Sequence, residues 1–194
     1  MIKNFSIFIF IVINLLLPFN TSQLKADDLN RIFNEGREKL TEKDYDEALK
    51  KFDKVIQKDP EYWQAYHNRG LSKQKLKDFE GSIIDFTKAI ELGCNRTEVF
   101  EIRGKCYDQI GQFRLAVADF SKAIELEPNR HFNYYHRANS FRKGKQYLAA
   151  REDYRKVLAL SSNQKLIDLA ITRLQDIENL DDQSPSVATT DTYT

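Results

Sequence analysis

A period of 34 residues is the feature that most constrains how this chain can fold. Residues 81–92 (Gly-Ser-Ile-Ile-Asp-Phe-Thr-Lys-Ala-Ile-Glu-Leu) align at that shift with residues 115–126 (Leu-Ala-Val-Ala-Asp-Phe-Ser-Lys-Ala-Ile-Glu-Leu). Extending the shift in both directions gives four units without insertions, over residues 29–62, 63–96, 97–130 and 131–164. Such self-similarity is typical of architectures in which one unit cannot bury its apolar face without its neighbours.

Small and aromatic residues recur at fixed positions when each unit is numbered from 1 to 34. Each unit has two stretches with apolar residues at helical spacing, separated by a polar turn near positions 14 to 16. Small residues at positions 8 and 20 allow two antiparallel helices to approach closely, and a ring at position 24 fills the space beside them. Position 8 holds Gly36, Gly70, Gly104 and Ala138, and position 24 holds Phe52, Phe86, Phe120 and Tyr154.

This pattern of small and aromatic residues, with Pro60 and Pro128 at position 32 of two units, resembles the tetratricopeptide repeat family over residues 29–164. The resemblance implies an all-α fold, a right-handed α-α superhelix (solenoid) of four helix-turn-helix repeats. Residues 165–180 carry another apolar stripe at helical spacing, which predicts a capping helix. We therefore expect a repeat domain over residues 27–180, and a disordered tail over the polar residues 181–194.

Residues 1–26 have the composition of a secretory signal peptide. Lys3 precedes an apolar run over residues 5–17, and Ala26 precedes the acidic start of the next segment. The run is shorter than the roughly 20 residues that span a bilayer, so we expect cleavage after Ala26 and export to a periplasmic, lumenal or secreted location. The cleaved chain would not associate with a membrane. The alternative is an uncleaved segment that anchors a repeat adaptor to a membrane.

Charged residues recur at positions 7 and 23 with opposite signs. Units two to four have arginine at position 7 and aspartate at position 23, and unit one reverses both signs. The two positions lie on opposite arms of an antiparallel hairpin, so a structural pair is favoured over a ladder of ligand-binding arginines. The predicted pairs are Glu35–Lys51, Arg69–Asp85, Arg103–Asp119 and Arg137–Asp153.

The sequence does not favour catalysis, a cofactor or a metal ion. Cys94 and Cys106 lie too far apart for a disulfide if a helix separates them, and we expect two free thiols. The three histidines lack ligand spacing, and no metalloprotease, phosphate-loop or nucleophile motif is present in the sequence. A formal net charge of +1 gives no reason to expect nucleic acid as a partner. An enzyme or an enzyme subunit remains the less favoured alternative.

The resemblance also implies where a partner would bind. In the family the first helix of each unit lines the inner face, and binding residues come mainly from positions 2, 5, 9, 12 and 13. Only Asn68 matches the arrangement with which some members clamp a chaperone C-terminus, so a chaperone adaptor is not expected. The predicted partner-binding residues are Phe33, Arg37, His67, Asn68, Lys105, Phe132, Tyr135, Asn139 and Arg142.

These observations predict a non-catalytic scaffold for protein interaction outside the cytoplasm. Its inner groove would hold a peptide or a partner helix, and an assembly factor is the role that we expect. Self-association through the terminal helix is a further alternative, and the sequence does not predict the oligomeric state.

Overall fold

A computed structural model describes residues 23–182, which are helical with short turns and contain no strand in that range. The chain divides into two compact units, one up to Cys94 and one from Asn95, between the second and third repeats. The predicted repeat domain over residues 27–180 thus consists of two units. The predicted signal peptide (1–26) and tail (181–194) lie outside the described residues, apart from 23–26 and 181–182. None of the described helices is long and apolar enough to cross a membrane.

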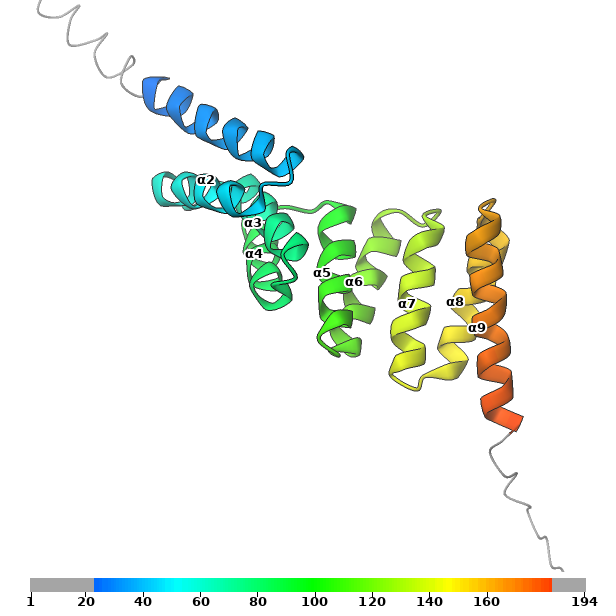
Figure 1. Cartoon of the computed structure of the whole chain (residues 1–194). Coiled ribbons are helices and arrows are strands. Elements are labelled where there is room, and N and C mark those ends of the chain that lie inside the picture. The colour runs from blue at the N-terminus through cyan, green and yellow to red at the C-terminus, as the bar shows by residue number, and fades with distance from the viewer. Residues whose placement is uncertain (1–22, 183–194) are drawn as a thin grey trace, which may run out of the picture. The chain divides into compact units, whose positions relative to one another are not determined.

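The N-terminal unit contains two helical hairpins. A helix over residues 23–41 is followed by α2 (Tyr45–Lys58), α3 (Trp63–Lys75) and α4 (Phe79–Glu91) (Figure 1). The first of these helices starts before the repeat does and continues through the bond after Ala26, where we expected cleavage. Ile32, Val55 and Ala65 form one buried cluster, so three successive helices share a core.

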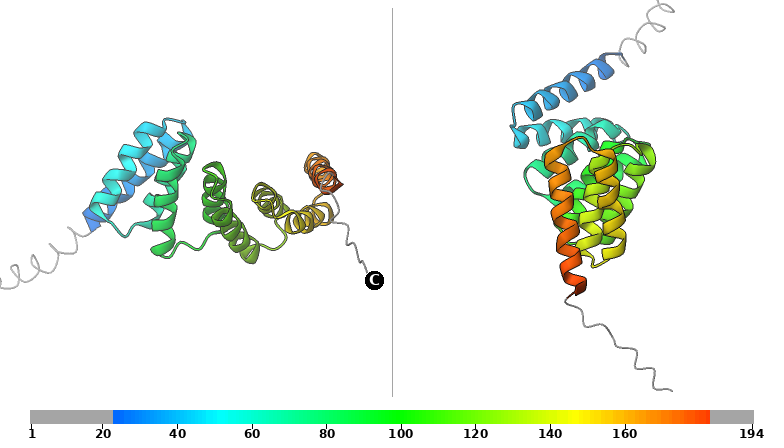
Figure 2. Two further views of the ribbon diagram at one scale, coloured as in Figure 1. Left: turned by 90° about the horizontal axis from the view of Figure 1, so that it is seen from below. Right: turned by 90° about the vertical axis from the view of Figure 1, so that its right-hand side faces the viewer.

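The C-terminal unit contains two further hairpins and one additional helix. Its helices are α5 (Thr97–Gln109), α6 (Phe113–Leu126), α7 (His131–Lys143), α8 (Tyr147–Leu160) and α9 (Gln164–Asp182), and they follow one another in chain order (Figure 2). The all-α prediction and the helical-hairpin repeats are therefore confirmed. The predicted capping helix over residues 165–180 corresponds to α9, which is slightly longer.

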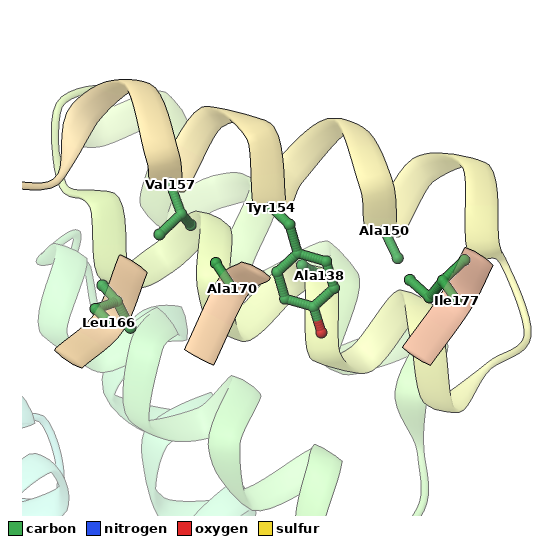
Figure 3. Packing of buried hydrophobic residues seen from close by; sticks show 7 residues of the cluster. All are labelled: Ala138, Ala150, Tyr154, Val157, Leu166, Ala170 and Ile177. Carbon is green, nitrogen blue, oxygen red and sulfur yellow. The ribbon is translucent and has the colours of Figure 1, made fainter. Parts of the chain in front are cut away.

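The core of the C-terminal unit joins α7, α8 and α9. Tyr154 of α8 is fully buried in the middle of this cluster, with Ala138 of α7 and Ala170 of α9 among its members (Figure 3). Leu166 and Ile177 extend the contact along α9. Because α9 contributes three buried residues to this cluster, it completes the apolar surface that the fourth repeat would otherwise expose.

The two helices of each hairpin approach each other closely at position 8, which explains the small residues there. A Cβ atom built on Gly36 would lie 2.8 Å from Phe52 Cε1, and one built on Gly104 would lie 3.1 Å from the ring of Phe120. Contacts of 2.8 Å between carbon atoms are strongly repulsive, so glycine allows the ring of the second helix to pack against the first. The fourth repeat accommodates Ala138 beside Tyr154.

The turn inside each hairpin has the same backbone conformation at position 15. Lys43, Lys77, Gly111 and Lys145 have positive φ angles of 65°, 64°, 78° and 61°. Only one of the four is glycine, the residue that adopts this region without a steric cost. Asp44 and Asp78 follow the first two of these residues and cap the second helix, accepting hydrogen bonds from Glu47 N and Gly81 N.

Candidate functional site

The structure brings together all four pairs predicted between positions 7 and 23. In repeats two to four the arginine donates two parallel hydrogen bonds, from Nε to Oδ2 and from Nη2 to Oδ1 of the aspartate. The distances are 2.9 and 2.6 Å for Arg69–Asp85, 2.8 and 2.7 Å for Arg103–Asp119, and 2.7 Å twice for Arg137–Asp153. In the first repeat Lys51 Nζ lies 2.7 Å from Glu35 Oε2.

These arginines have a structural role, because each is partly buried and its charge is paired with that of an aspartate. The side chains of Asp85, Asp119 and Asp153 are buried, and hydrogen bonding to Asp153 raises the pKa of Arg137. Arg137 also lies 5.8 Å from the ring centres of two aromatic residues on its own helix. A guanidinium held in this way is not available as a ladder for anionic ligands.

Arg69 and Arg137 also reach the preceding repeat, which the sequence did not predict. Arg69 Nη1 lies 2.5 Å from Asp53 Oδ1, and Arg137 Nη1 donates to Ser121 Oγ at 2.9 Å. Asp53 and Ser121 occupy position 25 of their repeats. A polar residue recurring at that position was the signal that could have revealed the contact.

The predicted binding residues of the N-terminal unit differ in accessibility. His67 is only 6% exposed and its ring packs edge-on against Phe86, so little of this predicted binding residue is accessible to a partner. Phe33 packs against the ring of Phe52 and belongs partly to the core. Asn68 is half-buried and donates to the carbonyl of the residue one turn earlier at 2.7 Å, whereas Arg37 is exposed.

In the C-terminal unit two predicted residues line an apolar hollow between α7 and α9. Its volume is about 260 Å³. We name it the α7–α9 hollow; its lining residues are Phe132, Tyr135 and His136 of α7, Leu166 and Leu169 of α9, and the exposed Asn163 and Lys165. Phe132 is 44% exposed and Leu169 37% exposed, so two large apolar side chains face solvent beside the hollow. The sequence indicated Phe132 and Tyr135 but not Leu166 and Leu169, because no repeat position marks the residues of α9 that face α7.

Asn139 and Arg142 belong to a hydrogen-bonded cluster one to two turns further along α7. The Tyr154 hydroxyl donates to Asn139 Oδ1 at 2.8 Å, and the nearby guanidinium of Arg142 acts to lower the pKa of the same hydroxyl. Asn139 Nδ2 donates to the backbone carbonyl of Tyr135 at 3.0 Å, which fixes the orientation of the amide. Burial raises the pKa of Tyr154 to about 12, so this hydroxyl stays protonated.

Lys105 of α5 is half-buried and influences the α7–α9 hollow electrostatically. Burial, together with the charges of Lys105 and Lys143 and against the charge of Asp108, lowers the pKa of His136 to about 4. The imidazole is therefore neutral near pH 7 and stacks on Phe120 with ring centres 5.5 Å apart. A neutral ring adds to the apolar lining of the hollow.

Within residues 23–182 no group of three histidine, cysteine, aspartate or glutamate side chains could hold a metal ion. Cys94 and Cys106 are buried thiols. The exposed apolar side chains and the polar cluster around Tyr154 are features that protein-interaction surfaces share.

The repeat geometry agrees with a family comparison. The profile of the tetratricopeptide repeat matches residues 64–92, 97–130 and 133–164, which cover the second, third and fourth repeats. The chain belongs to the tetratricopeptide repeat family. The profile does not include the first repeat, whose reversed charge pair and unusually long first helix depart from the other three.

Solved structures of other tetratricopeptide repeat proteins share the fold. MamA is 19% identical over 76% of this chain and 94% of its own, with a TM-score of 0.64. MamA from Desulfovibrio magneticus RS-1 is 16% identical over 82% and 98%, with a TM-score of 0.67. A tetratricopeptide repeat protein from Parabacteroides merdae is 16% identical over 80% and 62%, with a TM-score of 0.72. A comparison with curated protein sequences gave no match. At these identities the likeness concerns the fold.

Proposed function

We propose that this tetratricopeptide repeat protein is a non-catalytic scaffold that binds a protein partner at the α7–α9 hollow. The observation that carries the proposal is the exposure of Phe132 and Leu169 beside an apolar hollow on the first-helix side of the fourth repeat. Exposed apolar groups that converge on a concavity mark sites of protein interaction. The hollow has the size to accept one large apolar side chain from an extended peptide or a partner helix.

Affinity capture with matched variants tests this surface. The full-length chain and the variant Phe132→Ser/Leu169→Ser are compared as baits in an extract from the source cells. Leu148→Ser is the control, because Leu148 is 76% exposed on α8 and contributes nothing to the hollow. We expect the double variant to lose partners that the control retains. Identical capture by all three proteins would show that the hollow is not the binding surface.

We further propose that the scaffold acts outside the cytoplasm and assists the assembly of an envelope or membrane complex. The support is the sequence of residues 1–26, with a basic start, a short apolar run and a small residue before an acidic segment. Mass spectrometry of the protein recovered from the source cells tests export. A mature chain that begins at Asp27 is the expected result, and an intact N-terminus would contradict cleavage.

One structural observation favours a second candidate, a repeat adaptor whose N-terminal segment stays attached. The helix over residues 23–41 continues through the bond between Ala26 and Asp27, and proteases cleave loops and termini more readily than helices. In that case residues 1–22 would tether the repeats to a membrane. Recovery of the intact chain in the membrane fraction, even after a high-salt wash, would establish this candidate, and recovery in the soluble fraction would rule it out.

A further inference from the structure

Two arginines converge on one buried hydroxyl beside the α7–α9 hollow. The charge of Arg142 of α7 and that of Arg173 of α9 both act on the Tyr154 hydroxyl, and Arg173 also acts on that of Tyr135. The Nε atoms of both arginines are buried without a hydrogen-bond acceptor within residues 23–182. Two guanidinium groups from different helices therefore lie near the same buried hydroxyl.

The positive charge of this region is only partly balanced. Arg173 Nη1 lies 2.9 Å from Asp176 Oδ2, one turn along the same helix. No carboxylate between residues 23 and 180 lies within ion-pair distance of Arg142. One positive charge is thus left over in a half-buried setting, where an unpaired charge is costly. A single carboxylate would match it, whereas a dianion would exceed it.

The spacing along α7 relates this charge to the apolar hollow. Phe132 and Arg142 are ten residues apart on one helix, which corresponds to about 15 Å. An extended peptide advances roughly 3.3 Å per residue, so four to five residues cover that distance. A ligand lying along α7 can therefore fill the hollow and reach the arginines at the same time.

We propose that the α7–α9 surface recognises an extended acidic peptide. One aspartate or glutamate of the peptide would pair with Arg142 and Arg173. A bulky apolar residue four to five positions away would enter the hollow between Phe132 and Leu169. The inference rests on the proposed function and adds the chemistry of the partner to it. Guanidinium–carboxylate pairing at a partly buried site supplies specificity, and the apolar anchor supplies most of the affinity.

A series of labelled synthetic peptides tests the proposal on the full-length chain. Each peptide carries one glutamate and one phenylalanine separated by one to eight serine or alanine positions, in both orders, and binding is followed by fluorescence anisotropy. We expect the tightest binding in one of the two orders at a separation of four to five residues. Replacing glutamate with glutamine in that peptide should raise the Kd about tenfold. Equal affinity of the glutamate and glutamine peptides, or no dependence on spacing, would overturn the proposal.

Variants of the protein assign the effect to the arginines. Arg142→Gln should bind the glutamate and glutamine peptides equally, because the group that distinguishes them is gone. Arg155→Gln is the matched control, since Arg155 is exposed on α8 and the change in charge is the same. The peptide comparison on the unaltered protein does not depend on how well these variants fold.

The outcomes also separate this inference from the proposed function. Partner capture that requires Phe132 and Leu169 but is unchanged in Arg142→Gln would support the scaffold and reject the acidic peptide. Capture that is unaffected by any of these changes would reject the surface itself.

Discussion

Arg137 and Asp153 form a two-point ion pair across the fourth hairpin, with both N···O distances at 2.7 Å. The third guanidinium nitrogen donates to Ser121 of the preceding repeat at 2.9 Å. One side chain therefore holds its own hairpin together and connects it to the hairpin before. Asp153 is only 4% exposed, so its charge depends on this partner rather than on water.

Replacing Arg137 with methionine should destabilise the protein by about 3–5 kcal/mol, because a buried carboxylate would be left without its counter-charge. Urea denaturation followed by far-UV circular dichroism measures the loss. The double variant Arg137→Met/Asp153→Leu should recover much of it, since both charges are then removed. Lys50→Met breaks an exposed pair with Glu47 and should have a much smaller effect. Equal losses for the buried and exposed pairs would contradict this explanation.

Glycine at position 15 should stabilise the hairpin turns that now contain lysine. Lys77→Gly and Lys145→Gly remove the steric cost of a positive φ angle and should each raise the free energy of unfolding by about 1 kcal/mol. Gly111→Ala should lower it by a similar amount. Lys75→Gly, in the last turn of α3, is the control and should destabilise the protein. Thermal melts that place Lys77→Gly below the unaltered protein would contradict the prediction.

His136 should make the protein less stable in mild acid. Its pKa is about 4 in the folded chain, chiefly because of burial, whereas an unperturbed histidine titrates near 6.5. Between these values the unfolded chain binds a proton that the folded chain does not. The stabilisation is therefore complete above pH 6.5 and is lost as the pH falls toward 4, by on the order of 3 kcal/mol.

The variant His136→Phe keeps a ring against Phe120 and cannot titrate, so it isolates this effect. Its free energy of unfolding should fall less than that of the unaltered protein between pH 7 and pH 4. Parallel pH profiles for the two proteins would show that His136 does not contribute.

Asn133 should be replaceable by an apolar residue with a gain in stability. Its side chain is fully buried, and neither the amide oxygen nor the amide nitrogen has a hydrogen-bond partner within residues 23–182. The same position holds the buried Ala65 and Val99 in the two preceding repeats. Asn133→Val should therefore raise the free energy of unfolding by about 1 kcal/mol in urea denaturation. A decrease would indicate that a buried water molecule satisfies the amide.

Features that lie within one hairpin could be predicted from the residues alone. The 34-residue period placed the small residues opposite the rings and placed positions 7 and 23 close enough to pair, as Gly104 beside Phe120 and Arg103 beside Asp119 show. These contacts connect segments only 16 residues apart, through a turn of constant length. The same local geometry therefore recurs wherever the pattern recurs.

The accessibility of the predicted binding residues, and which of them share one site, depended on the packing of whole helices. Phe33, His67 and Tyr135 share position 5, yet His67 is buried against Phe86 whereas Tyr135 lines the α7–α9 hollow. The position is the same, but the element that covers it differs from repeat to repeat. Arg142 and Arg173 act on the same hydroxyl because α9 docks on the fourth repeat. The repeat pattern therefore specified the hairpins, and the packing of α9 against them produced the binding surface that we propose.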